Sequence, residues 1–253
     1  MTSPISRRDF LATAGALVAV GGLSSCLAAE GGEDASQLLS RPGPPAERAE
    51  PGRHPLSLGG DRDGFVYVPA SYAPEKPAPL AVLLHGAGQS SRKWASAPLE
   101  SLFGNRGIVV LCPDSRATSW DLRNGGFGAD VRFIDAALAL VFRRCAIEPT
   151  RIVLGGFSDG ASYALSLGAS NGDLFPALMA FSPGFFRPGT LRGKPRIFIS
   201  HGTSDSILPI DETSRRLVPL LRKRGYAVKY VEFPGPHTVP EDIAQSAVEW
   251  FME

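Results

Sequence analysis

The G-x-S-x-G motif at residues 156–160 (GFSDG) is the part of this sequence best suited to covalent chemistry. It stands between a β-branched run at 151–155 and a helical stretch that begins at Asp159. At such a junction the serine lies on a tight turn, with its hydroxyl exposed at the positive end of the helix dipole. Short motifs of this kind also arise by chance, so the strand-to-helix context carries the prediction that Ser158 is a nucleophile.

A serine hydroxyl needs a neighbouring base to act as a nucleophile near neutral pH. After a motif of this type the acid and then the base follow in the chain. Asp205 comes after the strand-like run at 196–200, and His237 stands in the loop before the last helix. We therefore expect His237 to take the Ser158 proton and Asp205 to orient His237. Asp211 is the alternative acid, although its place at a helix start favours an N-cap.

The glycine-rich segment at residues 85–88 (HGAG) follows an apolar run and offers backbone amides to the same site. Preorganised amides stabilise the oxyanion that forms during acyl transfer, by roughly 3–4 kcal/mol for each donor. We expect the donors to be the backbone N–H groups of Ala87 and of Asp159, the residue after the nucleophile.

The elements that must position these residues alternate between short β-branched runs and amphipathic stretches. Strands are predicted at 64–69, 80–85, 108–112, 151–155, 177–181, 196–200 and 228–233. Helices are predicted at 93–104, 130–144, 159–168, 211–224 and 239–251. Several strands are apolar on both faces, as in parallel strands covered by helices. The alternation predicts an α/β fold with a doubly wound, mostly parallel sheet, and a site at the carboxyl ends of its strands.

Aromatic residues occur in the loops that follow these strands. Trp120, Phe127 and Phe185 are candidates for a substrate pocket, and a place at the rim of the core is the alternative. Only 14 residues separate the strands at 177–181 and 196–200, too few for a helical lid. We expect an open site suited to small, soluble or polymer-end esters.

Four motifs in this order resemble the alpha/beta hydrolases, and among them the small serine esterases. LLHGAG, GGFSDGA, HGTSD and GPH are similar to segments of the phospholipase/carboxylesterase and polyhydroxybutyrate-depolymerase-like families. TSWD at 118–121 and DVRFID at 130–135 extend the resemblance over most of residues 64–253. The phospholipase/carboxylesterase relatives often have Gln after the serine, where this chain has Asp159.

The resemblance implies one alpha/beta-hydrolase domain, residues 57–253, without a large lid and without a cofactor. It implies a triad of Ser158, Asp205 and His237 that cleaves carboxylic esters through an acyl-enzyme. Two alternatives stay open: peptide or thioester cleavage by the same fold, and a hydrolase-like module that binds at the cell surface without turnover. A complete triad with an oxyanion loop disfavours the second alternative.

Composition excludes several other classes of function. The chain has 253 residues, 43% of them apolar and 20% charged, which suits one domain with a full core. With 26 basic and 25 acidic residues, it has no overall basic field for nucleic acid. Its three cysteines form no zinc module, and no cluster suggests a catalytic metal. Cys112 and Cys145 could form a disulfide after export or stay as buried thiols.

Residues 1–26 are typical of an export signal rather than of a folded element. Paired arginines precede an apolar, glycine-interrupted run at 11–23, a pattern that resembles the bacterial twin-arginine signal. Leu23-Ser24-Ser25-Cys26 resembles a lipobox, in which Cys26 becomes lipid-modified; the alternative is that Cys26 is removed with the signal. We expect an exported bacterial protein, periplasmic or at the cell surface, whose only membrane contact is this lipid anchor. Its expected partners are an ester substrate and the twin-arginine export machinery.

Residues 27–56 separate this signal from the expected domain. The segment is rich in Pro, Gly and charge and lacks Ile, Val, Phe, Tyr and Trp up to residue 55. Such a composition buries too little apolar surface to offset the entropy of ordering. We expect a disordered tether, in which His54 has no function.

Overall fold

The computed structural model describes residues 34–94, 97–123 and 125–253. Within them, an eight-stranded sheet has the order β1-β2-β4-β3-β5-β6-β7-β8. The strands are β1 Gly52–Pro55, β2 Gly64–Val68, β3 Ala78–Leu84, β4 Val109–Pro113, β5 Ile147–Phe157, β6 Ala177–Phe181, β7 Arg196–Gly202 and β8 Val228–Phe233. The helices are α1 Ser91–Trp94, α2 Ala97–Gly104, η1 Asp121–Arg123, α3 Ala129–Arg144, α4 Asp159–Ser170, α5 Ser214–Lys223 and α6 Glu241–Met252. The pairs β1–β2 and β2–β4 are antiparallel, and every other pair is parallel.

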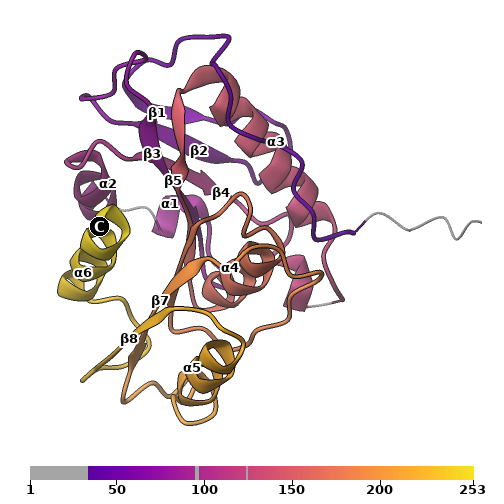
Figure 1. Ribbon diagram of the computed structural model, residues 1–253, viewed down its shortest axis with the longest axis vertical. Helices are drawn as coiled ribbons and strands as arrows, with labels where there is room; N and C mark the ends of the chain where they lie inside the picture. Colours follow the sequence, from indigo (N-terminus) through magenta and orange to yellow (C-terminus); the bar gives the residue numbers. More distant parts are fainter. Residues whose placement is uncertain (1–33, 95–96, 124) are drawn as a thin grey trace, which may run out of the picture. The chain divides into compact units, whose positions relative to one another are not determined.

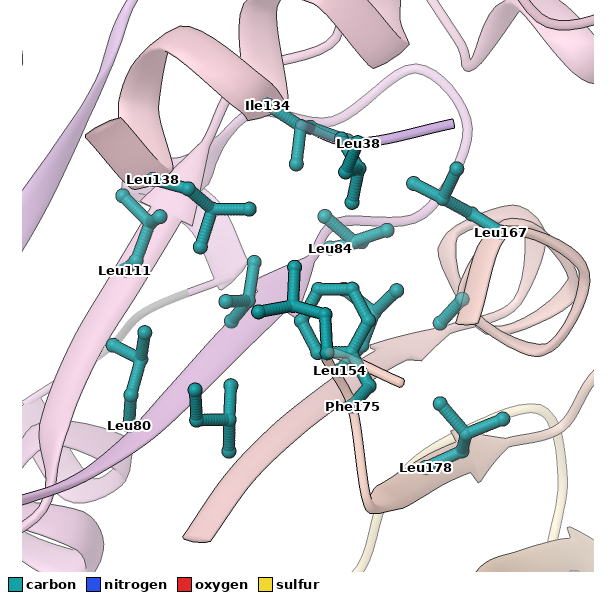
Figure 2. Packing of buried hydrophobic residues seen from close by; sticks show 14 of the residues in the cluster. Leu38, Leu80, Leu84, Leu111, Ile134, Leu138, Leu154, Leu167, Phe175 and Leu178 are labelled. Atoms are coloured by element: carbon teal, nitrogen blue, oxygen red, sulfur yellow. The ribbon is translucent and has the colours of Figure 1, made fainter. Parts of the chain in front are cut away.

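Helices cover both faces of the sheet, because its central strands are apolar on both sides. In β3, Leu80, Val82 and Leu84 join a core with side chains of α3, α4 and α5, whereas Ala81 and Leu83 join a second core with α2 and α6. Figure 1 shows α2 and α6 on one side of the strands and α3 and α4 on the other. Figure 2 shows the first core from close by. The predicted doubly wound α/β fold is confirmed.

The start of α5 differs from the predicted one. The sequence suggested a helix from Asp211, but α5 begins at Ser214 with Thr213 as its N-cap residue. Asp211 instead accepts a hydrogen bond from the guanidinium of Arg215, at 2.9 Å. The expectation that Asp211 caps this helix is therefore wrong.

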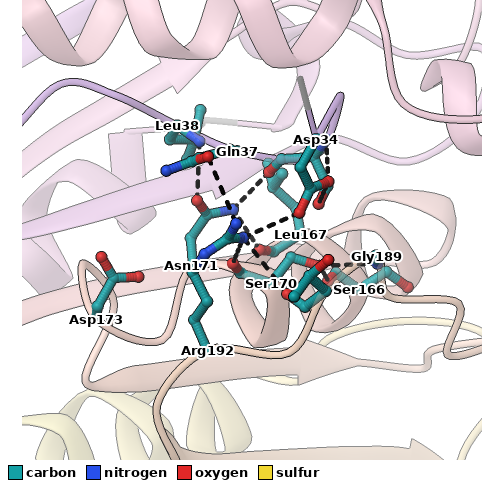
Figure 3. Close-up of polar contacts among 12 residues, drawn as sticks. Asp34, Gln37, Leu38, Ser166, Leu167, Ser170, Asn171, Asp173, Gly189 and Arg192 are labelled. Atoms are coloured by element: carbon teal, nitrogen blue, oxygen red, sulfur yellow. Dashed lines mark hydrogen bonds and ion pairs between the residues drawn. The ribbon is translucent and has the colours of Figure 1, made fainter. Parts of the chain in front are cut away.

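Residues 34–56 pack against the domain, which corrects the expected disordered tether. Leu38 is fully buried, and its N–H donates to the side-chain oxygen of Asn171 at 2.8 Å. The amide nitrogen of Asn171 donates in turn to Ser36 O, at 2.7 Å (Figure 3). His54 lies in β1, which extends the sheet by pairing with β2. Two buried leucines, Leu38 and Leu56, and the buried amide of Asn171 help to hold a segment whose average composition is that of a linker.

Cys112 and Cys145 are both buried and remain thiols. Cys112 belongs to the core that α2 and α6 cover, and Cys145 belongs to the core on the other face of the sheet. The sheet between them explains why no disulfide joins the two.

The expected export signal, residues 1–26 with Cys26, lies outside the described residues, as do residues 27–33. In the described part of the chain, no helix is both long enough and apolar enough to cross a bilayer.

Candidate active site

Ser158 lies on the turn between β5 and α4, where a nucleophile was expected. Its backbone has φ 58° and ψ −118°, a left-handed conformation that non-glycine residues rarely adopt and that occurs often at functional sites. The turn brings the flanking backbone so close that a Cβ at Gly156 would lie 2.6 Å from the Gly160 carbonyl. A Cβ at Gly160 would lie 2.4 Å from Leu84 O. Both glycines are therefore required by the packing of the turn.

Asp205 and His237 meet in the loops after β7 and β8. His237 Nδ1 is 2.5 Å from Asp205 Oδ2. Asp205 Oδ1 accepts the backbone N–H groups of Ile207 and Leu208, at 2.9 and 2.8 Å. Burial alone would raise the pKa of Asp205, but the hydrogen bonds from Leu208 and His237 outweigh burial and lower it. An ionised Asp205 only accepts, so Nδ1 of His237 carries a proton and Nε2 is left to act as a base.

His201 also contacts the acid, a role that the sequence analysis did not identify. Its fully buried ring places Nε2 3.1 Å from Asp205 Oδ2 and 2.8 Å from Leu208 O. Both partners are acceptors, so Nε2 carries the proton and Nδ1 accepts from the Ser214 hydroxyl, at 2.7 Å. Burial lowers the pKa of His201, which keeps the ring neutral near pH 7. Its place at the end of a strand, four residues before Asp205, is the signal that could have found it.

One cavity of about 530 Å³ is shared by Ser158, His237 and the loop at residues 85–88. Ser158, Asp159, Ala87 and His237 all line this cavity. The His237 ring also packs on the ring of Phe157, the residue before the nucleophile, with 4.6 Å between centroids. The structure therefore brings the expected nucleophile, base and oxyanion donors together, with Asp205 behind the base.

Ala87 and Asp159, the two residues expected to supply backbone N–H donors, both line this cavity. Asp159 is the first residue of α4, where a backbone N–H has no acceptor within the helix. The loop that carries Ala87 is fixed on both sides: Gly88 N–H donates to Thr118 O at 2.7 Å, and Trp120 Nε1 donates to His85 O at 2.8 Å.

His85 fixes this loop from within the core. Its Nε2 accepts the backbone N–H of Ser115 at 3.0 Å, so Nδ1 carries the proton and donates to Gly86 O at 2.8 Å. Burial lowers the pKa of His85, so the ring is neutral near pH 7. A neutral ring keeps this hydrogen-bond pattern, with one nitrogen donating and the other accepting.

Of the three candidate pocket aromatics, only Phe185 lines the cavity. Trp120 is fully buried between His85 and Tyr163, with ring centroids 4.9 and 5.1 Å away. Phe127 packs edge-on against Tyr163 at 5.7 Å. The pocket role expected for Trp120 is therefore wrong, because its ring fills the core under the loop at residues 85–88. Phe127 is half-buried and packs against that core, and it does not line the cavity.

The buried carboxylate of Asp159 explains how that core is attached to the turn. It accepts hydrogen bonds from the Ser119 hydroxyl and, at 3.4 Å, from Trp120 N–H. The Asp159 side chain therefore ties the start of α4 to the loop before η1. Among the described residues, no three His, Cys, Asp or Glu side chains are grouped as a metal site.

The chain is similar in sequence to two known enzymes. Over 154 residues the chain is 27% identical to a bifunctional acetylxylan esterase/xylanase of Neocallimastix patriciarum, covering 59% of this chain and 22% of that protein. Over 139 residues it is 26% identical to a poly(3-hydroxybutyrate) depolymerase of Ralstonia pickettii, covering 47% and 28%. The match thus spans about a quarter of the length of these curated relatives.

Solved structures show the same fold at low sequence identity. The carboxylesterase of Bacillus cereus superposes with a TM-score of 0.59 and 20% identity, covering 78% of this chain and 96% of that one. The profile of the alpha/beta hydrolase family matches residues 81–251, which include the turn, the acid loop and the base loop. The chain belongs to the alpha/beta hydrolase family.

Proposed function

We propose that this chain is a serine carboxylic-ester hydrolase that works through an acyl-enzyme. The observation that carries the proposal is the shared cavity: Ser158, on a strained turn, faces the same space as His237, whose Nδ1 is held by Asp205 at 2.5 Å. A held imidazole with a free Nε2 is the base that a serine nucleophile requires.

The first half-reaction forms the acyl-enzyme. Ser158 Oγ attacks the ester carbonyl carbon while His237 Nε2 takes the hydroxyl proton. The carbonyl oxygen gains the negative charge and accepts hydrogen bonds from the amides of Ala87 and Asp159. When the intermediate collapses, the carbon–oxygen bond to the alcohol breaks and Nε2 returns its proton to the departing oxygen. Asp205 stays ionised throughout and stabilises the imidazolium.

The second half-reaction repeats these steps with water. Water attacks the acyl carbon as Nε2 takes its proton, and the second intermediate expels Ser158 Oγ, which recovers the proton. The products are a carboxylic acid and the free enzyme. His201 takes no proton in this scheme; it is a positioning residue that holds Asp205.

The relatives and the shape of the site favour small or polymer-derived esters as substrates. The two curated relatives are named for acetylxylan esterase and poly(3-hydroxybutyrate) depolymerase activity. Residues 182–195, between β6 and β7, contain no helix that could act as a lid. An open cavity admits the end of a polymer as readily as a small ester.

Matched acetyl esters, thioesters and anilides test the bond that is cleaved. We expect the oxygen ester to be hydrolysed and the Ser158→Ala variant to be inactive on it, while a burst of released alcohol marks the acyl-enzyme. Turnover of the anilide alone would replace the esterase proposal with peptide cleavage. A folded chain inactive on all three would favour the binding module.

We further propose that the chain is exported by the twin-arginine route and anchored through lipid on Cys26. The proposal rests on the paired Arg7 and Arg8, the apolar run after them and the lipobox-like sequence. Fractionation of cells that produce the Cys26→Ser variant tests it. We expect the variant to leave the membrane fraction, and continued membrane association would contradict the anchor.

A further inference from the structure

Two arginines line the cavity that contains Ser158. Arg123 ends η1, and Arg187 lies in the loop after β6, with its guanidinium carbon 5.1 Å from the centroid of the Phe185 ring. Both side chains belong to exposed residues. Neither forms an ion pair with a carboxylate of the described residues.

Some surface arginines elsewhere in the described residues do have an acidic partner. Arg41 pairs with Asp173, at 2.6 Å, and Arg215 pairs with both Asp211 and Glu232. Of the residues that line the cavity, Asp159 alone carries a carboxylate, and that group is buried and bonded to Ser119. The lining of the cavity therefore carries two positive charges without an ion-pair partner among the described residues.

The Arg187 loop is built onto the helix that carries the nucleophile. Three serines of α4 at a spacing of four residues each donate to the carbonyl four positions earlier: Ser162, Ser166 and Ser170. The same three hydroxyls accept the backbone N–H groups of the loop residues Gly184, Arg187 and Gly189, at 2.8–2.9 Å. Figure 3 shows the last of these contacts, from Gly189 to Ser170.

This serine ladder fixes the backbone of Arg187 relative to Ser158, because one continuous helix carries both the ladder and the turn. A side chain on a fixed backbone loses less conformational freedom when it binds a ligand than one on a mobile loop. The position of Arg187 is thus a feature of the active-site framework.

We propose that Arg123 and Arg187 form a carboxylate-recognition subsite, and that the preferred substrates are esters with a free carboxylate on their acyl or alcohol part. The inference rests on the proposed esterase function. A guanidinium matches the two oxygens of a carboxylate with paired N–H donors, which makes arginine the usual residue for this group. Phe185 and the 67% exposed Ile207 line the same cavity and would contact a short hydrocarbon between the ester and the carboxylate.

Matched pairs of esters test the subsite in the full chain. The first pair, 4-nitrophenyl hydrogen glutarate and 4-nitrophenyl pentanoate, differs by a carboxylate on the acyl part. The second, 4-(butyryloxy)benzoate and its methyl ester, differs by a carboxylate on the leaving group. We expect kcat/KM to be higher for the anionic ester than for the neutral ester in at least one pair. Arg187→Gln or Arg123→Gln should lower this ratio of kcat/KM values about 5- to 20-fold, chiefly by raising KM for the anionic ester.

Arg151→Gln is the matched control, because Arg151 is an exposed arginine of β5 that does not line the cavity. It should leave the preference unchanged. Equal kcat/KM values within both pairs, or a preference that survives both cavity substitutions, would overturn the subsite while leaving the esterase intact.

A binding measurement separates the subsite from the reaction. In the Ser158→Ala background, calorimetry should show that 4-nitrophenyl hydrogen glutarate binds more tightly than the pentanoate, and that Arg187→Gln removes the difference. Such binding without turnover by the unmodified chain would retain the subsite and refute the ester chemistry. Equal binding of the two esters would refute the subsite.

Discussion

Replacing Asp205 by asparagine is a sharp test of the hydrogen-bond geometry, because the surrounding groups dictate how the new amide must lie. Two backbone N–H groups, from Ile207 and Leu208, point at Oδ1 and require an oxygen there. The amide NH2 must then occupy the position of Oδ2, where it meets His237 Nδ1.

In that arrangement the amide donates to Nδ1, so the imidazole proton moves to Nε2. His237 can then no longer take the proton of Ser158. The same amide faces the proton on His201 Nε2, which keeps only its bond to Leu208 O. From the inverted tautomer we expect kcat to fall about 10³- to 10⁴-fold, which is about 4–5.5 kcal/mol in the activation free energy.

Steady-state kinetics on a neutral nitrophenyl ester, with circular dichroism as a check of folding, measure this effect. Asp211→Asn is the matched control: Asp211 is exposed and pairs with Arg215, so kcat should change less than about twofold. An Asp205→Asn variant that folds and keeps more than a tenth of kcat would refute the reasoning. A large loss in Asp211→Asn instead would move the acid to that residue.

Three further predictions concern the framework. Leu38→Ala should lower the free energy of unfolding by about 2–5 kcal/mol. The adjacent Leu39 is 73% exposed, so Leu39→Ala should change it by no more than about 0.5 kcal/mol. Equal effects of the two variants in urea unfolding would contradict the packing of residues 34–56 against the domain. Burial lowers the pKa of His85 in the folded chain, so on acidification the unfolded chain takes up a proton on His85 at a higher pH than the folded chain does. The free energy of unfolding should therefore fall by up to about 1.4 kcal/mol per pH unit below about pH 6.5. Urea midpoints unchanged between pH 7 and 5 would count against this prediction. Burial raises the pKa of Cys145 to about 11, so iodoacetamide should label it, by mass spectrometry, only after unfolding; rapid labelling of the native chain would be the contrary result.

The fold was predictable where the sequence repeats a simple pattern. The strands β3, β4, β6 and β7 are short apolar runs between turn residues, and each occurs close to its predicted place. Ser158 was predictable because glycine is the residue type that fits on either side of this turn. Asp205 and His237 were found from their place after strands, since the carboxyl ends of parallel strands share one edge of the sheet.

The remainder depends on contacts that no local pattern records. Leu38 is held by Asn171, which lies 133 residues away in the chain, so composition alone predicted disorder for its segment. Trp120 occupies a loop, as pocket residues often do, yet its indole fills the core and supports the oxyanion loop. His201 is one of several strand-end residues by sequence, and only the folded loops bring it to Asp205.

Labelling with a fluorophosphonate tests the central claim most directly, because the probe requires an activated serine and no knowledge of the substrate. The full chain would be labelled and the adduct mapped by mass spectrometry, with Ser158→Ala and His237→Ala as controls. The account predicts an adduct on Ser158 that is absent in the first control and strongly reduced in the second. A folded chain with no adduct, or with an adduct on another serine, would contradict it.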